Sequence, residues 1–282
     1  MSDALEERVE RALGTPVSAV ESLGGGMIGD AYRVDLADGR RRVAKVGDTP
    51  LTVEDFMLRY LAEHSDLPVP TVHHASDDLL VLEYVEGTSE ITPAVERDLA
   101  DHLARLHDVT APAVGFPRDT LDGPLEQPNP WTVSWIDFYR EHRLERAAEG
   151  AREHGPLTGA LAERLAALST DLDGLLREPD RPALIHGDVW RTNVLARDGR
   201  VVAFLDPATY YAHPEIELSY VDWTDTGGDP FFDRYRDRRR IADGFFETRR
   251  DVYVLHPLLV HVRLFGEEYL EDLDRALERL GY

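Results

Sequence analysis

The spacing of apolar residues changes near residue 86, and this change limits the folds open to the chain more than any other feature. Before it, short alternating runs predict strands at 17–23, 31–36, 41–46, 71–75 and 79–85, with helices at 3–13 and about 52–64. After Glu86-Gly87, helical spacing predicts helices at about 93–108, 131–150 and 157–177, and again towards the end of the chain. We therefore expect an α+β protein of two lobes. Residues 1–86 would form a five-stranded antiparallel β lobe with one main helix, and residues 87–282 a mostly α-helical lobe.

Composition excludes several classes of protein. The 282 residues are 43% hydrophobic, enough for a packed core, and include no cysteine, which excludes disulfides and thiolate metal sites. No window holds the roughly 18 to 20 apolar residues that a membrane span needs. The start Met1-Ser2-Asp3 lacks the basic and apolar regions of a signal peptide. We expect a cytoplasmic protein that binds no membrane, as a monomer or a weak homodimer.

The charge is strongly unbalanced: 31 Lys and Arg residues stand against 54 Asp and Glu residues, for a net charge of −23. Such a surface repels nucleic acid and anionic membranes. A solvated acidic coat is the favoured interpretation. Lys45 is the only lysine in the chain, and an acidic, lysine-poor sequence resembles proteins from a high-salt cytoplasm. A halophilic source is therefore a hypothesis.

Three polar residues follow one another closely in the small β element predicted at 183–206. Asp188 and Asn193 lie five apart in a polar loop, and Asp206 ends the apolar run 201–205. Phosphoryl transfer needs positioning, metal and charge neutralisation more than covalent help from the protein. Asp188 fits the base that accepts a substrate proton, and Asn193 and Asp206 fit the ligands of Mg²⁺. His186, just before this loop, is expected to be structural.

A glycine-rich stretch, Gly24, Gly25, Gly26, Met27, Ile28 and Gly29, lies between two predicted strands. The pattern alone is weak, because a flexible glycine hairpin would look the same. A dinucleotide-binding fold would need a helix after the glycines, whereas a hairpin can cover phosphates with its backbone N–H groups. In this context the stretch favours a nucleotide-covering hairpin.

Lys45 lies on an apolar strand, in Val43-Ala44-Lys45-Val46. Lysines in such positions are often surface residues that extend to solvent. Every other basic residue of this chain is Arg, however, and a compact ammonium suits the α- and β-phosphates of ATP better than a planar guanidinium does. Glu54, at the start of the next predicted helix, is placed to pair with Lys45, although it also suits the helix dipole.

Two departures separate this pattern from protein kinases. Gly187 stands where protein kinases carry Arg, and Asp206-Pro207-Ala208 replaces Asp-Phe-Gly. No Ala-Pro-Glu motif or long activation segment follows. Together with the order of the motifs, this predicts a protein-kinase-like fold whose acceptor is a small molecule.

At this level of detail the chain resembles the fructosamine/ketosamine-3-kinase family, within the aminoglycoside-phosphotransferase-like fold. The resemblance is carried by Gly24-Gly25-Gly26 with Tyr32, by H-G-D-x-W-x-x-N at 186–193, and by the run from Asp206-Pro207-Ala208 to Glu215. Segments 131–144 and 265–269 agree with it, so it spans nearly the whole chain. Trp190 and the run Tyr210-x-x-His213-x-Glu215 discriminate most. His213 and Glu215 are expected to be structural.

The resemblance implies ATP-dependent phosphorylation of the 3-hydroxyl of a ketosamine, bound to protein or to a small amine, with ATP and Mg²⁺ as cofactors. It implies that Glu83 and Val85 offer backbone hydrogen bonds to adenine. It also suggests that Trp190 stacks on the sugar beside Asp188, although a buried packing role is an equal alternative. Met27 stands where many relatives carry Cys, which excludes thiol-based regulation there.

Two other functions remain open. A kinase for another small hydroxyl substrate, such as an aminoglycoside, choline or a sugar, would use the same machinery. A pseudokinase scaffold would bind nucleotide without turnover, although the presence of Lys45, Glu54, Asp188, Asn193 and Asp206 disfavours it.

Overall fold

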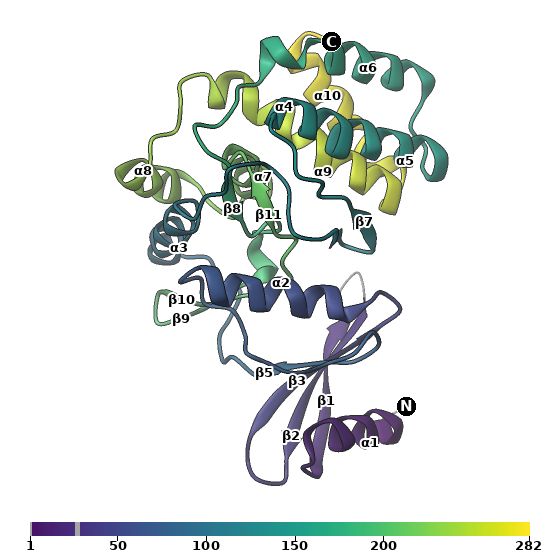
Figure 1. Ribbon diagram of the computed structural model, residues 1–282, viewed down its shortest axis with the longest axis vertical. Coiled ribbons are helices and arrows are strands. Elements are labelled where there is room, and N and C mark those ends of the chain that lie inside the picture. Colours follow the sequence, from purple (N-terminus) through teal and green to yellow (C-terminus); the bar gives the residue numbers. More distant parts are fainter. Residues whose placement is uncertain (1, 26–28) are drawn as a thin grey trace.

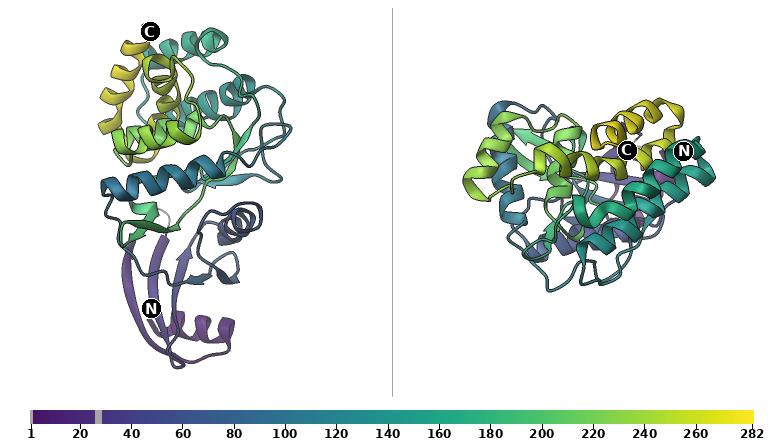
Figure 2. Two further views of the ribbon diagram at one scale, coloured as in Figure 1. Left: turned by 90° about the vertical axis from the view of Figure 1, so that its left-hand side faces the viewer. Right: turned by 90° about the horizontal axis from the view of Figure 1, so that it is seen from above.

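The computed structural model describes residues 2–25 and 29–282, and its β-rich and helical parts lie at opposite ends of an elongated molecule (Figures 1 and 2). Five antiparallel strands form the main sheet in the order β1-β2-β3-β5-β4. They are β1 (Val17–Gly25), β2 (Gly29–Leu36), β3 (Arg41–Gly47), β4 (Val72–Ala75) and β5 (Leu80–Glu83). The predicted five-stranded antiparallel sheet is confirmed.

Two helices cover opposite faces of this sheet (Figure 1). Alternate residues of a strand point to opposite faces, so a single strand can contact both helices. Val81 of β5 packs with α1 (Ser2–Leu13), through Leu5 and Val9. Its neighbours Leu80 and Leu82 pack instead with α2 (Leu51–His64). Helix α2 therefore lies between the sheet and the rest of the molecule, the place from which Glu54 reaches β3.

The remainder is largely helical, as the spacing beyond residue 86 predicted. Its helices are α3 (Pro93–Leu106), α4 (Trp135–Tyr139), α5 (Arg146–His154), α6 (Gly159–Leu175), α7 (Glu215–Trp223), α8 (Asp229–Arg238), α9 (Arg250–Phe265) and α10 (Leu270–Leu280). Short π-helical turns are η1 (Arg140–Glu145) and η3 (Phe245–Arg249), and 3₁₀ turns are η2 (Arg191–Asn193) and η4 (Glu267–Tyr269). Within the described ranges, no helix is long and apolar enough to cross a membrane.

Three small antiparallel strand pairs lie within the helical part. They are β6 (Thr120–Asp122) with β7 (Leu125–Gln127), β8 (Ala183–Ile185) with β11 (Tyr210–Ala212), and β9 (Val194–Arg197) with β10 (Arg200–Phe204). The β9–β10 pair holds the chain where it leaves the main sheet, because Thr88 and Ala196 exchange backbone hydrogen bonds of 2.9 and 2.8 Å. A Cβ on Gly87 would lie 3.1 Å from the Ala196 oxygen, so this close approach favours glycine.

Several predicted boundaries were wrong. The helix predicted from residue 131 begins at Trp135, capped by the Ser134 side chain, and Trp131 precedes it with 51% of its surface exposed. Helical spacing alone also did not show that η1 interrupts this segment. The strand predicted at 79–85 ends at Glu83. The β6–β7 hairpin was missed, because strands of three residues leave little periodic signal.

Candidate active site

The β8–β11 pair presents the loop that carries Asp188. Gly187 has φ of 90°, and a Cβ there would lie 2.2 Å from the Ala208 oxygen, so this turn requires glycine. The Gly187 N–H donates to Glu217 Oε1 at 2.7 Å, which ties the loop to α7. His186 is fully buried and its Nδ1 accepts from the Asp188 N–H at 3.3 Å. Burial lowers the pKa of His186 to about 4, so it is neutral at pH 7 and suits the structural role expected of it.

Asp188 and Asn193, which the sequence placed in one polar loop, lie in contact. The η2 turn brings Asn193 back towards Asp188, where Nδ2 donates to Asp188 Oδ2 at 2.8 Å and to its carbonyl oxygen at 3.1 Å. Burial raises the pKa of Asp188 to about 7, and the nearby charge of Asp122 adds to the rise. Hydrogen bonds from Tyr220 and Asn193 oppose it. A half-buried carboxylate of raised pKa, oriented by two donors, has the properties of a general base.

A pocket of about 550 Å³, open to solvent, surrounds Asp188. Its lining comes from the Asp188 loop, the β6–β7 hairpin and helices α7 and α9, and includes Asp122, Tyr220 and His256. The sequence analysis missed all three. Tyr220 had a weak signal, since it is a polar residue on a mostly buried helix, but Asp122 lies in the unpredicted hairpin and had none.

Lys45 joins the sheet to the helical part. Its Nζ donates to Glu54 Oε1 at 2.7 Å and to Asp206 Oδ1, 161 residues away along the chain. Burial opposes the charged ammonium, but Asp206 and Glu54 outweigh it and hold the pKa of Lys45 above its usual value. Burial raises the pKa of Glu54 although Lys45 opposes the rise. The Lys45–Glu54 pair therefore forms as predicted, and it includes Asp206.

Asp206 follows β10 and has φ of 53°, a left-handed conformation that Asp tolerates better than most residues do. Its side chain is 45% exposed, in contrast to Asn193, which is 5% exposed. An Asp198-Gly199 turn joins β9 to β10, and both residues have positive φ, of 53° and 74°. This tight hairpin fixes the position of β10 and therefore the position of Asp206, which follows it.

The glycine-rich stretch lies where β1 turns into β2. Gly24 has φ of 94°, and Gly25 pairs with Asp30 at the end of the hairpin. The predicted residues Gly26 and Met27 lie outside the described residues. Gly29 of β2 pairs with Gly47 of β3, two residues beyond Lys45. Strand β2 therefore lies next to the strand that carries the lysine.

Glu83 and Val85 lie where the sheet leads into the helical part. Glu83 ends β5, and its exposed carboxylate accepts from the Thr71 hydroxyl at 3.0 Å. Val85 lies in the segment without regular secondary structure that leads to Thr88. Trp190, just before η2, is half-buried and is not among the residues that line the Asp188 pocket. The structure thus brings Asp188, Asn193, Lys45, Glu54 and Asp206 together, but leaves Trp190 beside the pocket.

Two buried networks hold these elements in place. Glu217, which binds the Gly187 N–H, also lies 2.8 Å from Nε2 of the fully buried His107. Glu215 forms a two-pronged ion pair with Arg249, each contact 2.7 Å long. Buried charges are usually paired in this way, because an unpaired buried charge is costly. The predicted structural role of Glu215 agrees with this geometry, while Glu217 was missed.

Known proteins resemble this chain over its whole length. A profile described as fructosamine kinase matches residues 1–281. "Protein-ribulosamine 3-kinase, chloroplastic" of Oryza sativa subsp. japonica is 30% identical over 270 residues, covering 90% of this chain and 76% of the relative. A "Probable ketoamine kinase" of Synechocystis is 30% identical over 292 residues, covering 98% of this chain and 95% of the relative.

Solved structures agree. A protein from Thermobifida fusca assigned as a fructosamine-3-kinase superposes with a TM-score of 0.89 at 31% identity, covering 99% of this chain and 98% of that one. An aminoglycoside phosphotransferase crystallised with ADP and hygromycin B has a TM-score of 0.69 at 19% identity, covering 99% and 97%, which shows the kinase-like fold alone. The family profile, the relatives and the fold all agree with the site geometry, and the chain belongs to the fructosamine kinase family.

Proposed function

We propose that this protein is an ATP-dependent kinase that phosphorylates the 3-hydroxyl of ketosamines, the adducts of sugars with amines. Membership of the fructosamine kinase family supports this activity. The observation that carries it is the joining of Lys45 to Asp206 beside Asp188 and Asn193, because these are the groups that phosphoryl transfer requires.

Asp188 is the proposed base. The 3-hydroxyl oxygen attacks the γ-phosphorus of ATP, the bond from that phosphorus to the bridging oxygen breaks, and ADP leaves. The hydroxyl proton passes to Asp188. Its raised pKa, near 7, makes it a better proton acceptor than an exposed aspartate. Asn193 and Tyr220 hold the carboxylate in one orientation.

The ATP-binding roles belong to the first lobe, for which we propose residues 1–86, with residues 87–282 forming the catalytic and acceptor lobe. Lys45 would neutralise the α- and β-phosphates while Glu54 fixes its position. The hairpin glycines from Gly24 to Met27 would cover the phosphates, and the backbone of Glu83 and Val85 would bind adenine.

Asn193 and Asp206 are the proposed ligands of Mg²⁺. An amide oxygen and a carboxylate are donors that this hard cation prefers, and the Asn193 amide nitrogen already points to Asp188. No group of three or more acidic or histidine residues able to hold a metal occurs in residues 2–25 and 29–282. A site with only two protein ligands is typical of magnesium, which usually completes its coordination shell with phosphates and water. When bound, the ion would neutralise charge on the β- and γ-phosphates.

For the acceptor, we propose a ribulosamine in preference to a fructosamine. The 3-phosphorylated product would be labile and would shed its sugar, so that the amine is restored and the adduct is repaired. Trp190 would stack on the sugar beside Asp188. Its half-buried position next to the pocket suits either stacking or packing.

The experiment combines one variant with a panel of acceptors. Asp188→Asn should lower kcat by about 10² to 10⁴-fold, the usual contribution of a general base, while ATP binding is nearly unchanged. Similar kcat values for variant and wild type would refute the role of Asp188. Ribulosyl- and fructosyl-amines should be phosphorylated in preference to aminoglycosides or choline. Turnover of those alternatives alone would indicate a different small-molecule kinase, and ATP binding without any turnover would indicate a pseudokinase.

The acidic composition suggests a salt-adapted enzyme. With 54 acidic against 31 basic residues, the negative charges of the protein repel one another, which weakens the fold, and they also repel ATP. Salt screens both kinds of repulsion. We expect thermal stability and the KM for ATP to improve as potassium chloride rises towards molar concentration. Equal stability and activity without added salt would contradict a halophilic origin.

A further inference from the structure

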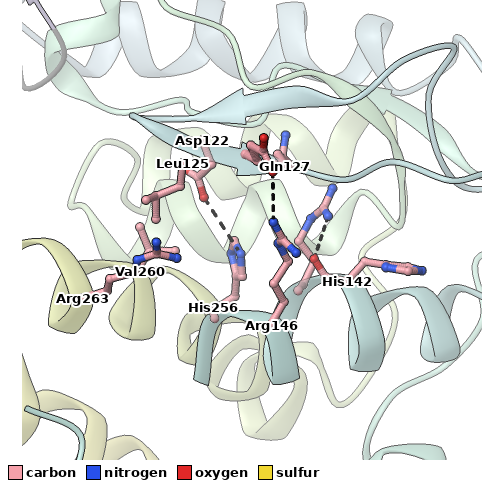
Figure 3. A pocket seen from close by; sticks show the side chains of 11 residues that line it. Asp122, Leu125, Gln127, His142, Arg146, His256, Val260 and Arg263 are labelled. Atoms are coloured by element: carbon pink, nitrogen blue, oxygen red, sulfur yellow. Dashed lines mark hydrogen bonds and ion pairs between the residues drawn. The ribbon is translucent and has the colours of Figure 1, made fainter. Parts of the chain in front are cut away.

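A second hollow adjoins the Asp188 pocket and has no part in phosphoryl transfer. The two share Asp122, Gln127, His256 and Val260 in their walls (Figure 3). The hollow measures about 390 Å³ with the solvent-open space included, and it lies between the β6–β7 hairpin on one side and the helical segments η1, α5 and α9 on the other. A group attached to an acceptor bound at Asp188 would therefore enter it.

Arg143 forms part of its inner wall and is a buried cation of an unusual kind. Its side chain is 1% exposed and lies over the rings of Phe138 and Tyr210, 4.7 and 4.1 Å from their centroids. Its Nη2 donates to Asn129 Oδ1 at 2.6 Å and its Nη1 to the carbonyl oxygens of Pro128 and His142 at 3.0 and 2.9 Å, but its Nε has no hydrogen-bond partner. Within the described part of the chain it forms no ion pair, although a buried charge normally needs one.

Two further arginines line the same hollow. Arg263 of α9 lies against Gly150, where a Cβ would be 2.6 Å from its Nη1, and forms no ion pair or hydrogen bond within residues 2–25 and 29–282. Arg146 of α5 lies 3.6 Å from Glu126, whose side chain is 85% exposed, so their pairing is weak. Three guanidinium groups without a strong acidic partner are notable in a chain with net charge −23.

Asp122 lies where the hollow meets the Asp188 pocket. Its carboxylate is 32% exposed and makes no hydrogen bond among the described residues, and the nearest histidine atom, His256 Nε2, is 3.9 Å away. Burial raises the pKa of Asp122, and Arg143 opposes the rise. Along the surface that joins the two pockets, the proposed base Asp188 comes first, the carboxylate of Asp122 second and the arginines last.

We propose that the acceptor is the ketosamine of a free α-amino acid, with its ammonium at Asp122 and its carboxylate among Arg143, Arg146 and Arg263. This inference rests on the proposed function. In such a molecule the amine is three carbons from the 3-hydroxyl oxygen, and the carboxylate lies on the far side of the amine. The neutral sugar hydroxyl would then face Asp188, the positive ammonium would face Asp122, and the negative carboxylate would face the arginines. A ketosamine on a protein lysine has no carboxylate next to its amine and would leave the arginines without a partner.

The test compares two acceptors that differ only in this carboxylate, N-ribulosyl-alanine and N-ribulosyl-alaninamide. For wild-type enzyme, kcat/KM should be about tenfold or more higher for the acid, in line with a charge-assisted hydrogen bond. In Arg146→Gln and Arg263→Gln this preference should fall towards one, because kcat/KM for the acid should fall more than kcat/KM for the amide. Arg152→Gln, on an exposed position of α5 outside the hollow, should keep the full preference.

The outcomes separate the two proposals. Equal use of acid and amide by wild type, or a preference that survives both substitutions, overturns the carboxylate site but leaves the kinase assignment intact. Preference for the amide overturns it as well. Turnover of neither acceptor, or of any other ketosamine, overturns the proposed function itself.

Discussion

Replacement of Asp188 by Asn should stabilise the protein at alkaline pH, although it removes the proposed base. The rise in the pKa of Asp188, from 3.8 to about 7, means that the folded protein holds a proton on this group where the unfolded chain has lost it. Stability therefore falls as pH rises from about 4 to about 7, and above pH 7 the whole penalty is present. Such a rise corresponds to at most about 4 kcal/mol, and solvent access to Asp188 reduces the expected penalty to about 2–4 kcal/mol.

Asn avoids this penalty because it is neutral at every pH and keeps a side-chain oxygen for the Asn193 amide and the Tyr220 hydroxyl. We expect Asp188→Asn to be more stable than wild type at both pH values, by about 2–4 kcal/mol at pH 8.5 and by roughly a third of that amount at pH 5, where only part of the penalty has developed. Denaturant unfolding followed by tryptophan fluorescence suits the measurement, because all four Trp residues lie beyond residue 130, in the part that holds Asp188.

The salt concentration should be the same at both pH values, since the chain carries a net charge of −23. Asp198→Asn is the matched control, because it removes an exposed carboxylate from a left-handed position that Asn tolerates. It should change stability equally at the two pH values. If Asp188→Asn gives the same difference from wild type at pH 5 and pH 8.5, the burial argument for its raised pKa is refuted.

Three further substitutions test the remaining contacts. Lys45→Arg should lower kcat/KM for ATP about tenfold or more, because a planar guanidinium cannot take the place of Nζ between Glu54 and Asp206. The control is Arg42→Lys on the same strand, which should keep full activity. Full activity of Lys45→Arg would show that the lysine is incidental. Asp206→Asn keeps the left-handed backbone but should abolish magnesium-dependent nucleotide binding in calorimetry, and unchanged affinity would refute its metal role. Gly187→Ala should destabilise the fold by more than about 2 kcal/mol, because its Cβ would meet the Ala208 oxygen; Gly159→Ala, where no atom lies within 4 Å, should be neutral or stabilising in the same unfolding assay.

Local features were predicted well from the sequence. Strand alternation placed all five strands of the main sheet, because each strand of a sheet with helices on its faces must alternate its side chains. Asp188 and Asn193 were placed in one polar loop by their spacing, and one short turn joins them in the structure. Lys45 was recognised because it is the only lysine in the chain.

Other features depended on contacts between distant segments. The helix predicted from residue 131 started too early, because the Ser134 cap and the pairing of Thr132 with Val114 decide where it begins. Stacking on the sugar and a packing role were equal alternatives for Trp190, and the motif could not show that this side chain lies outside the lining of the Asp188 pocket.

The sequence by itself determined the class of fold, the order of the motifs and the chemistry available to Asp188, Asn193 and Asp206, because these depend on residue type and short spacing. Only the tertiary structure showed that Asp122 and Tyr220 lie beside Asp188 and that arginines without a strong acidic partner lie further along the same surface. The physical reason is that a pKa and a pocket arise from burial and from charges that meet across the fold. The reaction is thus visible in local sequence, while the shape and charge of the acceptor are decided by packing.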